Sequence, residues 1–235
     1  MEVRMVDKLA IVGMNVVDLT QALFVAHSIL LMEFVTYQCE EKPHFAEAKK
    51  KNPKARRSAA NALQHTPDFV EPVTMVQCVD DFSKIRLLIA NLKKIEPETT
   101  SVASYLDSKD KGQIYIHEAL KLISRVRTRN GIFHIPLLDM DIPTDEIPYD
   151  LVFPYIKEVS QLLGVSSGVV VNSGKSYHLW GLDLMTVDAW HDFMHRALLL
   201  DRIDRRWVGH RLLDGQANLR VSPKWGKMPE VAYVF

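Results

Sequence analysis

Apolar positions along the chain predict both kinds of regular element, because a helix repeats every 3.6 residues and a strand every two. The longest apolar stretch, residues 9–40, contains no proline and no turn signal, so we expect a helix there. Further helices are predicted at residues 80–95, 114–129, 148–164 and 186–200. The third of these ends at Gly164 and the last opens at Thr186, which suits a helix cap.

Short runs rich in β-branched and aromatic residues lie between these helices and predict strands. They are residues 73–79, 132–141, 167–173, 176–184, 207–214, 219–223 and 229–235. Pro136 argues against a central ladder position for its part of the second run. Residues 172–175 form the expected turn of a hairpin. Helices and strands alternate around that hairpin, so the sequence predicts an α+β (mixed α/β) fold.

Composition excludes several classes of function but does not identify the function itself. The chain has 235 residues, 47% of them hydrophobic and 25% charged, and equal numbers of basic and acidic groups. A polycation that holds nucleic acid by bulk charge is therefore excluded, although residues 196–227 alone carry eight basic and three acidic groups. Two cysteines rule out a disulfide scaffold, so a reducing, cytoplasmic setting is expected. No secretory signal or membrane-spanning run is visible, so no membrane partner is expected.

Two carboxylates end the predicted strand at residues 132–141. Asp139 and Asp141 are two positions apart, and the period of a strand places both side chains on one face. Paired carboxylate oxygens suit Mg²⁺ or Mn²⁺. The same residues could equally be capping or turn residues before Pro143.

The predicted hairpin brings phosphate-binding groups together. Ser173, Lys175, Ser176 and His178 surround a tight turn, and hydroxyls, backbone N–H groups and a cation suit a phosphate chain. Ser176 and His178 are one strand repeat apart and should point the same way. A plain hairpin turn with a buried core histidine would have the same sequence.

A third group of charged residues follows the apolar run at residues 207–214. Asp214 ends that run, and Arg220, Ser222 and Lys224 then alternate along the next strand. A carboxylate beside a row of cations suits a metal–triphosphate site. The alternative is a surface hairpin with alternating polar residues.

The order of these three elements resembles the archaeo-eukaryotic primase superfamily, the primase-polymerases. The family's motifs are hydrophobic-DxD/E, SxH and hydrophobic-D, followed by a basic strand, and the matching stretches here are LLDMD, SYH, LLD and NLRVSPK. The resemblance covers residues 113–235. It implies an α/β module joined to a sheet of RNA-recognition-motif type, with the active site between them. We divide the chain into a helical N-terminal region, residues 1–70, and a primase-polymerase-like catalytic core, residues 71–235.

The resemblance also implies a function, template-directed nucleotidyl transfer of the kind used in DNA replication or repair. Nucleoside triphosphates and a nucleic acid template and primer would be the partners. Two ions of Mg²⁺ or Mn²⁺ would be held by Asp139, Asp141 and Asp214. The triphosphate would be bound by Lys175, His178, Arg220 and Lys224 together with Ser173 or Ser176. These two serines compete for the second motif, which often reads SGxGxH, because Ser176 stands at the place of the second glycine.

Two other interpretations remain open at this point. The chain could be a catalytically silent primase fold that binds nucleotide or nucleic acid, although three intact aspartates argue against that. It could also be an interaction subunit whose apolar N-terminal helix packs on a partner, although the chain's own core is the simpler place for that helix. The sequence leaves the oligomeric state open.

Overall fold

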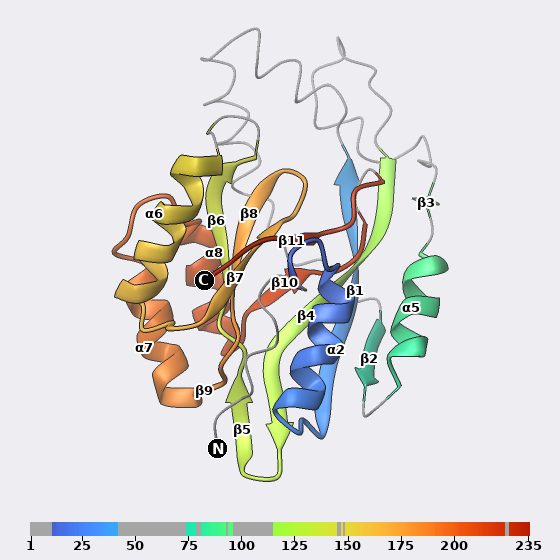
Figure 1. Ribbon diagram of the computed structural model, residues 1–235. Helices are drawn as coiled ribbons and strands as arrows, with labels where there is room; N and C mark the ends of the chain where they lie inside the picture. The colour runs from blue at the N-terminus through green and yellow to red at the C-terminus, as the bar shows by residue number, and fades with distance from the viewer. Residues whose placement is uncertain are drawn as a thin grey trace, which may run out of the picture.

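Two antiparallel sheets and five helices make up the part of the chain described by the computed structural model, which covers residues 11–41, 74–78, 81–92, 94–95, 115–144, 147, 149–223 and 226–235. The described helices are α2 (Val16–Ala26), α5 (Phe82–Ala90), α6 (Tyr149–Leu162), α7 (Val187–Ala197) and α8 (Arg205–Asp214). Figure 1 shows the two sheets and these helices. The expected α+β (mixed α/β) fold is therefore confirmed.

The larger sheet has the order β2-β1-β4-β5-β9, with β3 and β10 also paired to β4. Its strands are β1 (Leu31–Glu41), β2 (Thr74–Cys78), β3 (Lys94–Ile95), β4 (Tyr115–Thr128), β5 (Gly131–His134), β9 (Met185–Thr186) and β10 (Asn218–Arg220). Strand β4 alternates, because Leu122 and Val126 are buried while Lys121, Arg125 and Arg127 point to the other face.

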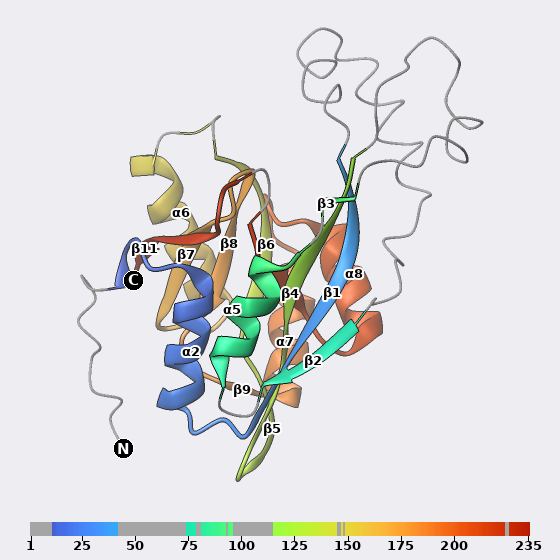
Figure 2. The same cartoon turned by 90° about the vertical axis from the view of Figure 1, so that its right-hand side faces the viewer.

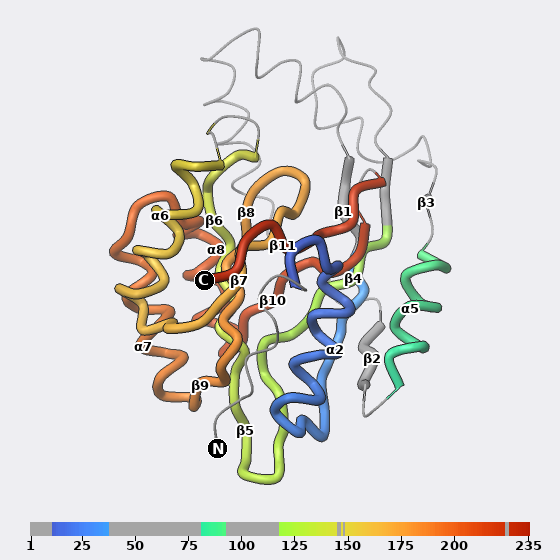
Figure 3. Tube along the Cα trace, viewed as in Figure 1, coloured from blue at the N-terminus to red at the C-terminus, as the bar shows by residue number. Residues whose placement is uncertain are grey.

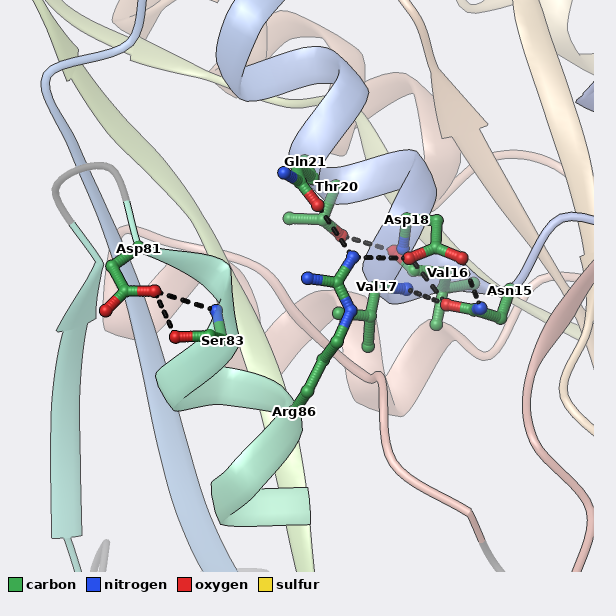
Figure 4. A network of polar contacts seen from close by, with 9 residues as sticks. All are labelled: Asn15, Val16, Val17, Asp18, Thr20, Gln21, Asp81, Ser83 and Arg86. Atoms are coloured by element: carbon green, nitrogen blue, oxygen red, sulfur yellow. Dashed lines mark hydrogen bonds and ion pairs between the residues drawn. The ribbon is translucent and has the colours of Figure 1, made fainter. Parts of the chain in front are cut away.

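Helices α2 and α5 cover the buried face of β1 and β4 (Figure 2). Phe34 of β1 meets Phe82 of α5 edge to face, with ring centroids 6.3 Å apart. Asn15 caps α2 by accepting hydrogen bonds from the backbone N–H groups of its first turn. Arg86 of α5 then reaches across to α2 and donates hydrogen bonds of 2.6 Å to Asp18 and to Gln21 (Figure 4).

The smaller sheet has the order β11-β7-β8-β6. Its strands are β6 (Leu137–Pro143), β7 (Gly168–Asn172), β8 (Ser176–Gly181) and β11 (Glu230–Val234). Helix α6 packs on one face of it, where Phe153 contacts Tyr177 with ring centroids 6.1 Å apart. His178, the next residue of β8, therefore points to the opposite face, away from α6.

The two sheets are joined where β5 passes into β6. Residues 135 and 136 separate these strands, so the run predicted as one strand at 132–141 is two strands belonging to different sheets. The Gly181 N–H donates a 2.8 Å hydrogen bond to the Pro136 carbonyl. A Cβ at Gly181 would lie 2.7 Å from Pro136 Cγ, so only glycine fits this junction.

Most predicted elements are confirmed, with small shifts at their ends. They include the hairpin β7–β8, helices α5, α6 and α7, and strands β2, β10 and β11. Thr186 caps α7 as expected, accepting a hydrogen bond from the Ala189 N–H.

Three predictions of secondary structure are wrong. The helix expected over residues 9–40 is α2 followed by the long strand β1, so the described part of the N-terminal region, residues 11–41, contains a strand as well as a helix, and β1 joins the larger sheet. The helix expected over 114–129 is strand β4, and the strand expected over 207–214 is helix α8. The boundary at residue 70 stays a prediction. No helix in the described residues is long and apolar enough to cross a membrane.

Candidate active site

Asp139 and Asp141 lie on one face of β6, as their spacing predicted. Leu138, Met140 and Ile142 alternate with them and are buried, whereas Asp139 is half-buried and Asp141 is exposed. The run of large apolar residues at every second position explains both the strand and the direction of the carboxylates. The two acids therefore lie on the face of the smaller sheet that α6 does not cover.

Asp139 faces His178 across the ladder between β6 and β8. The two residues are register partners, and His178 Nε2 lies 3.7 Å from Asp139 Oδ1. The His178 side chain is 7% exposed, and its Nδ1 is buried without a hydrogen-bond partner in the described residues. Burial and the positive charge of Arg220 lower the pKa of His178 to about 3. The imidazole is therefore neutral at pH 7.

Asp139 lies in a cluster of charges of both signs. Burial and the negative charge of Asp204 raise the pKa of Asp139 to about 7, Asp141 adds to this, and Lys175 and Lys121 oppose it. The Asp139 side chain is nevertheless 26% exposed, so solvent reaches it. A half-buried carboxylate with acidic neighbours is strongly disposed to bind a proton or a cation.

The turn between β7 and β8 is held by its own side chains. Ser173 Oγ donates a 2.8 Å hydrogen bond to the Ser176 carbonyl, and the Gly174 N–H donates one of 2.8 Å to Asn172 Oδ1. Gly174 has φ of +92°, a conformation that favours glycine. Lys175 at the tip is exposed, and Ser176 shares the strand face of His178. The hairpin prediction is thus confirmed in detail.

Arg220 links the two sheets at this turn. It lies on β10, beside β4 (Figure 3), and its guanidinium donates hydrogen bonds to the carbonyls of Ser222 and Ser173. The Ser222 hydroxyl in turn accepts a 2.9 Å hydrogen bond from the Leu120 N–H of β4. The structure therefore brings Arg220 together with the serine turn and with His178. Lys224 lies outside the described residues.

Asp214 lies apart from the other two predicted aspartates. It is the last residue of α8, where its carboxylate is 3.2 Å from Arg211 Nη2 and its side chain is 35% exposed. The other end of α8 adjoins Asp139, and a helix of this length spans about 15 Å. Within the described residues, no group of three or more His, Cys, Asp or Glu side chains is arranged to hold a metal ion.

Asp204 occupies the position beside Asp139 that the sequence interpretation gave to Asp214. Its N–H donates a 3.2 Å hydrogen bond to the Asp139 carbonyl, and the preceding Ile203 forms a β-bridge with Met140. Its carboxylate caps α8 by accepting a 2.9 Å hydrogen bond from the Trp207 N–H. Sequence reasoning missed it, although Ile203–Asp204 is also a hydrophobic residue followed by aspartate.

The chain matches a known protein family. The family described as archaeo-eukaryotic primase 1D-like matches residues 106–232, more than half of the chain. Neither a search of curated proteins nor a search of solved structures returns a match. The matched region contains strand β4 of the larger sheet, strand β6 with Asp139, and the turn between β7 and β8. The chain belongs to the archaeo-eukaryotic primase 1D-like family.

Proposed function

We propose that this primase-family chain is a template-directed nucleotidyltransferase, which adds nucleotides from nucleoside triphosphates to a primer on a nucleic acid template. The observation that carries the proposal is the pairing of Asp139 with His178, with Arg220 reaching the same turn from the other sheet. This arrangement sets carboxylates for cation binding directly beside groups for phosphate binding, which nucleotidyl transfer requires.

The donor atoms of these carboxylates suit the Mg²⁺ or Mn²⁺ that the family implies, although the three side chains are not gathered into a metal-binding group in the described structure. Asp139, Asp141 and Asp204 offer only oxygen donors. The pKa of Asp139 is raised first by burial and then by the negative charge of its acidic neighbours, which a divalent cation would neutralise. We therefore assign Asp204, in place of Asp214, as the third acidic residue. When bound, such cations would activate the 3′-hydroxyl of the primer and stabilise the leaving pyrophosphate.

The topology around β6 supports this assignment. Apart from the short β9, which belongs to the larger sheet, the chain runs β6, α6, β7, β8, α7 and then the Ile203 bridge. The strands lie in the order β7-β8-β6, with the bridge on the outer side of β6. This is the β-α-β-β-α-β arrangement that we propose as the sheet of RNA-recognition-motif type. In it, Asp204 lies on the segment directly beside the strand of Asp139 and Asp141.

The remaining predicted residues would bind the triphosphate. The neutral imidazole of His178 can donate an N–H to a phosphate oxygen, and its buried, unpartnered Nδ1 is consistent with a missing ligand. Ser173 shapes the turn by bonding to the Ser176 carbonyl, so we assign phosphate contact to the Ser176 hydroxyl. Lys175 and Arg220 add positive charge, and Lys224 would extend it.

Primer extension tests this function. The purified chain, a primed template, nucleotides and either Mg²⁺ or Mn²⁺ should give extended primer, and Asp139→Ala should give none. An identical blank result for both proteins with both metals would reject the enzyme.

A nucleotide-binding measurement separates the two forms of the hypothesis. Metal-dependent binding of nucleotide together with incorporation supports the polymerase. Binding without incorporation would instead favour a catalytically silent primase fold that holds nucleotide.

A further inference from the structure

Two cations lie directly opposite each other across neighbouring strands of the larger sheet. Lys121 of β4 is the register partner of Arg220 of β10, so both side chains share one face. Like charges in directly opposed positions destabilise a sheet. This face is also the one from which Arg220 reaches Ser173 of the smaller sheet. An anion bound between the two sheets would offset the repulsion.

An aromatic ring fixes the position of Lys121. Lys121 Nζ lies 4.0 Å from the centroid of the Tyr37 ring on β1. Tyr37 is paired with Ala119 and Lys121 with Val35, so Tyr37 and Lys121 are diagonal neighbours on one face. A cation held over an aromatic ring loses less freedom when it binds a ligand, because part of its side chain is already ordered.

The charge of Lys121 reaches the carboxylate cluster. It is one of the two cations that lower the pKa of Asp139, and the other is Lys175 on the serine turn. Positive charge therefore converges on Asp139 from β4 and from the β7–β8 turn. Neither Lys121 nor Tyr37 belongs to the three motifs that the sequence displayed, and Tyr37 precedes the region matched by the family.

We propose that Lys121 binds a phosphate group of the incoming nucleoside triphosphate, with Tyr37 as the residue that positions it. This inference rests on the proposed nucleotide site and extends it to the larger sheet. Lys121 contacts the ligand directly, whereas Tyr37 acts through Lys121. The N-terminal strand β1 thereby contributes to a site whose other residues come from the second half of the chain.

Nucleotide affinity in a set of single variants tests the inference. Lys121→Met should weaken binding of a nucleoside triphosphate with Mn²⁺ by about 10- to 100-fold, because it removes a charge-assisted contact. Tyr37→Leu should weaken it by about three- to tenfold, and Tyr37→Phe, which keeps the ring, by less than about twofold. Arg127→Met is the matched control, since Arg127 is an exposed cation on the same strand. It should leave affinity within about twofold.

Kinetic and stability measurements on Lys121→Met test the role of Lys121 further. Lys121→Met should raise the KM for nucleotide and leave the KM for primer–template unchanged. Its unfolding midpoint should stay close to that of the wild type, because the substitution removes both the repulsion with Arg220 and the attraction to the Tyr37 ring. If Lys121→Met and Tyr37→Leu bind nucleotide as the wild type does, the inference is overturned while the proposed function stands.

The same binding measurements, combined with nucleotide incorporation, distinguish failure of the proposed function from failure of the Lys121 phosphate site. If the wild type binds nucleotide without incorporating it, and Lys121→Met loses that binding, the phosphate site stands and the polymerase does not. A wild type that binds no nucleotide overturns both.

Discussion

Replacement of Asp139 by asparagine should make the protein more stable at alkaline pH and should remove its stabilisation by metal. The pKa of Asp139 is raised from 3.8 to about 7 in the folded chain, mainly by burial and by Asp204. A folded-state pKa above the unfolded value means that the ionised carboxylate opposes folding. The penalty begins above pH 3.8, grows with pH, and is complete above about pH 7.

The size of the effect follows from the shift. About three pKa units at 1.36 kcal/mol each give an upper limit of roughly 4 kcal/mol above pH 7. Solvent access to the side chain reduces this, so we expect Asp139→Asn to gain about 2–4 kcal/mol at pH 8 and clearly less at pH 5. Urea unfolding at the two pH values measures both differences.

Divalent cations should narrow the difference in stability between the two proteins. Mn²⁺ at about 100 times its dissociation constant should stabilise the wild type by roughly 2.7 kcal/mol. Asp139→Asn should respond much less. Equal stability of the two proteins at pH 8, or an equal response to Mn²⁺, would refute the electrostatic account of this carboxylate.

Two further predictions concern the fold around the site. Gly181→Ala should lower the free energy of unfolding by about 1–3 kcal/mol, because its Cβ would lie 2.7 Å from Pro136 Cγ. Gly209→Ala should raise it by about 0.5–1 kcal/mol in the same urea titration, because Gly209 lies on α8 with open space around it. Burial, Arg125 and His191 lower the pKa of His134 to about 4, so the stability that its neutral form provides is present above pH 6.5 and is lost as the pH falls from 6.5 to 4. Between pH 7 and pH 5 the wild type should therefore lose about 2 kcal/mol more than His134→Gln, and equal losses would contradict the burial argument.

The motifs that carry the chemistry were predictable because they depend on local patterns. Alternation of apolar and acidic residues was enough to place Asp139 and Asp141 on one strand face. The turn-forming residues Asn172, Ser173 and Gly174 were enough to place the hairpin turn and, beyond it, His178. Each of these features is decided by residues close together in the chain.

The wrong predictions concern elements whose local sequence pattern favours a different secondary structure from the one that they adopt. In β4, Leu120 and Leu122 are buried with the polar Lys121 between them, but this stretch of the sequence also suits an amphipathic helix. This segment is a strand because it pairs with β1, β5 and β10, and that pairing cannot be recognised from the neighbouring sequence. Residues 9–40 were misjudged because the break between α2 and β1 contains neither proline nor glycine; Ser28 takes the positive φ there.

The choice between two candidate third aspartates could not be made from the sequence for a related reason. Two hydrophobic-aspartate pairs, Ile203–Asp204 and Leu213–Asp214, flank a segment that was expected to be a strand ending at Asp214. The segment is helix α8, so its two ends are far apart, and the end next to Asp139 carries Asp204. Lys121 and Tyr37 were missed because they belong to no sequence motif and meet only through the register of β1 and β4.

The central claim is that a cluster of Asp139, Asp141 and Asp204 supports nucleotidyl transfer. Single-nucleotide incorporation on a primed template with Mn²⁺ tests it most directly when Asp204→Asn is compared with Asp214→Asn. We predict that Asp204→Asn lowers the rate by at least about 100-fold, the loss expected when a charge in the reacting site is removed. Asp214→Asn should remain within about threefold of the wild type, since its carboxylate is an exposed ion-pair partner of Arg211. A full rate for Asp204→Asn, or loss of activity for Asp214→Asn alone, would contradict the account.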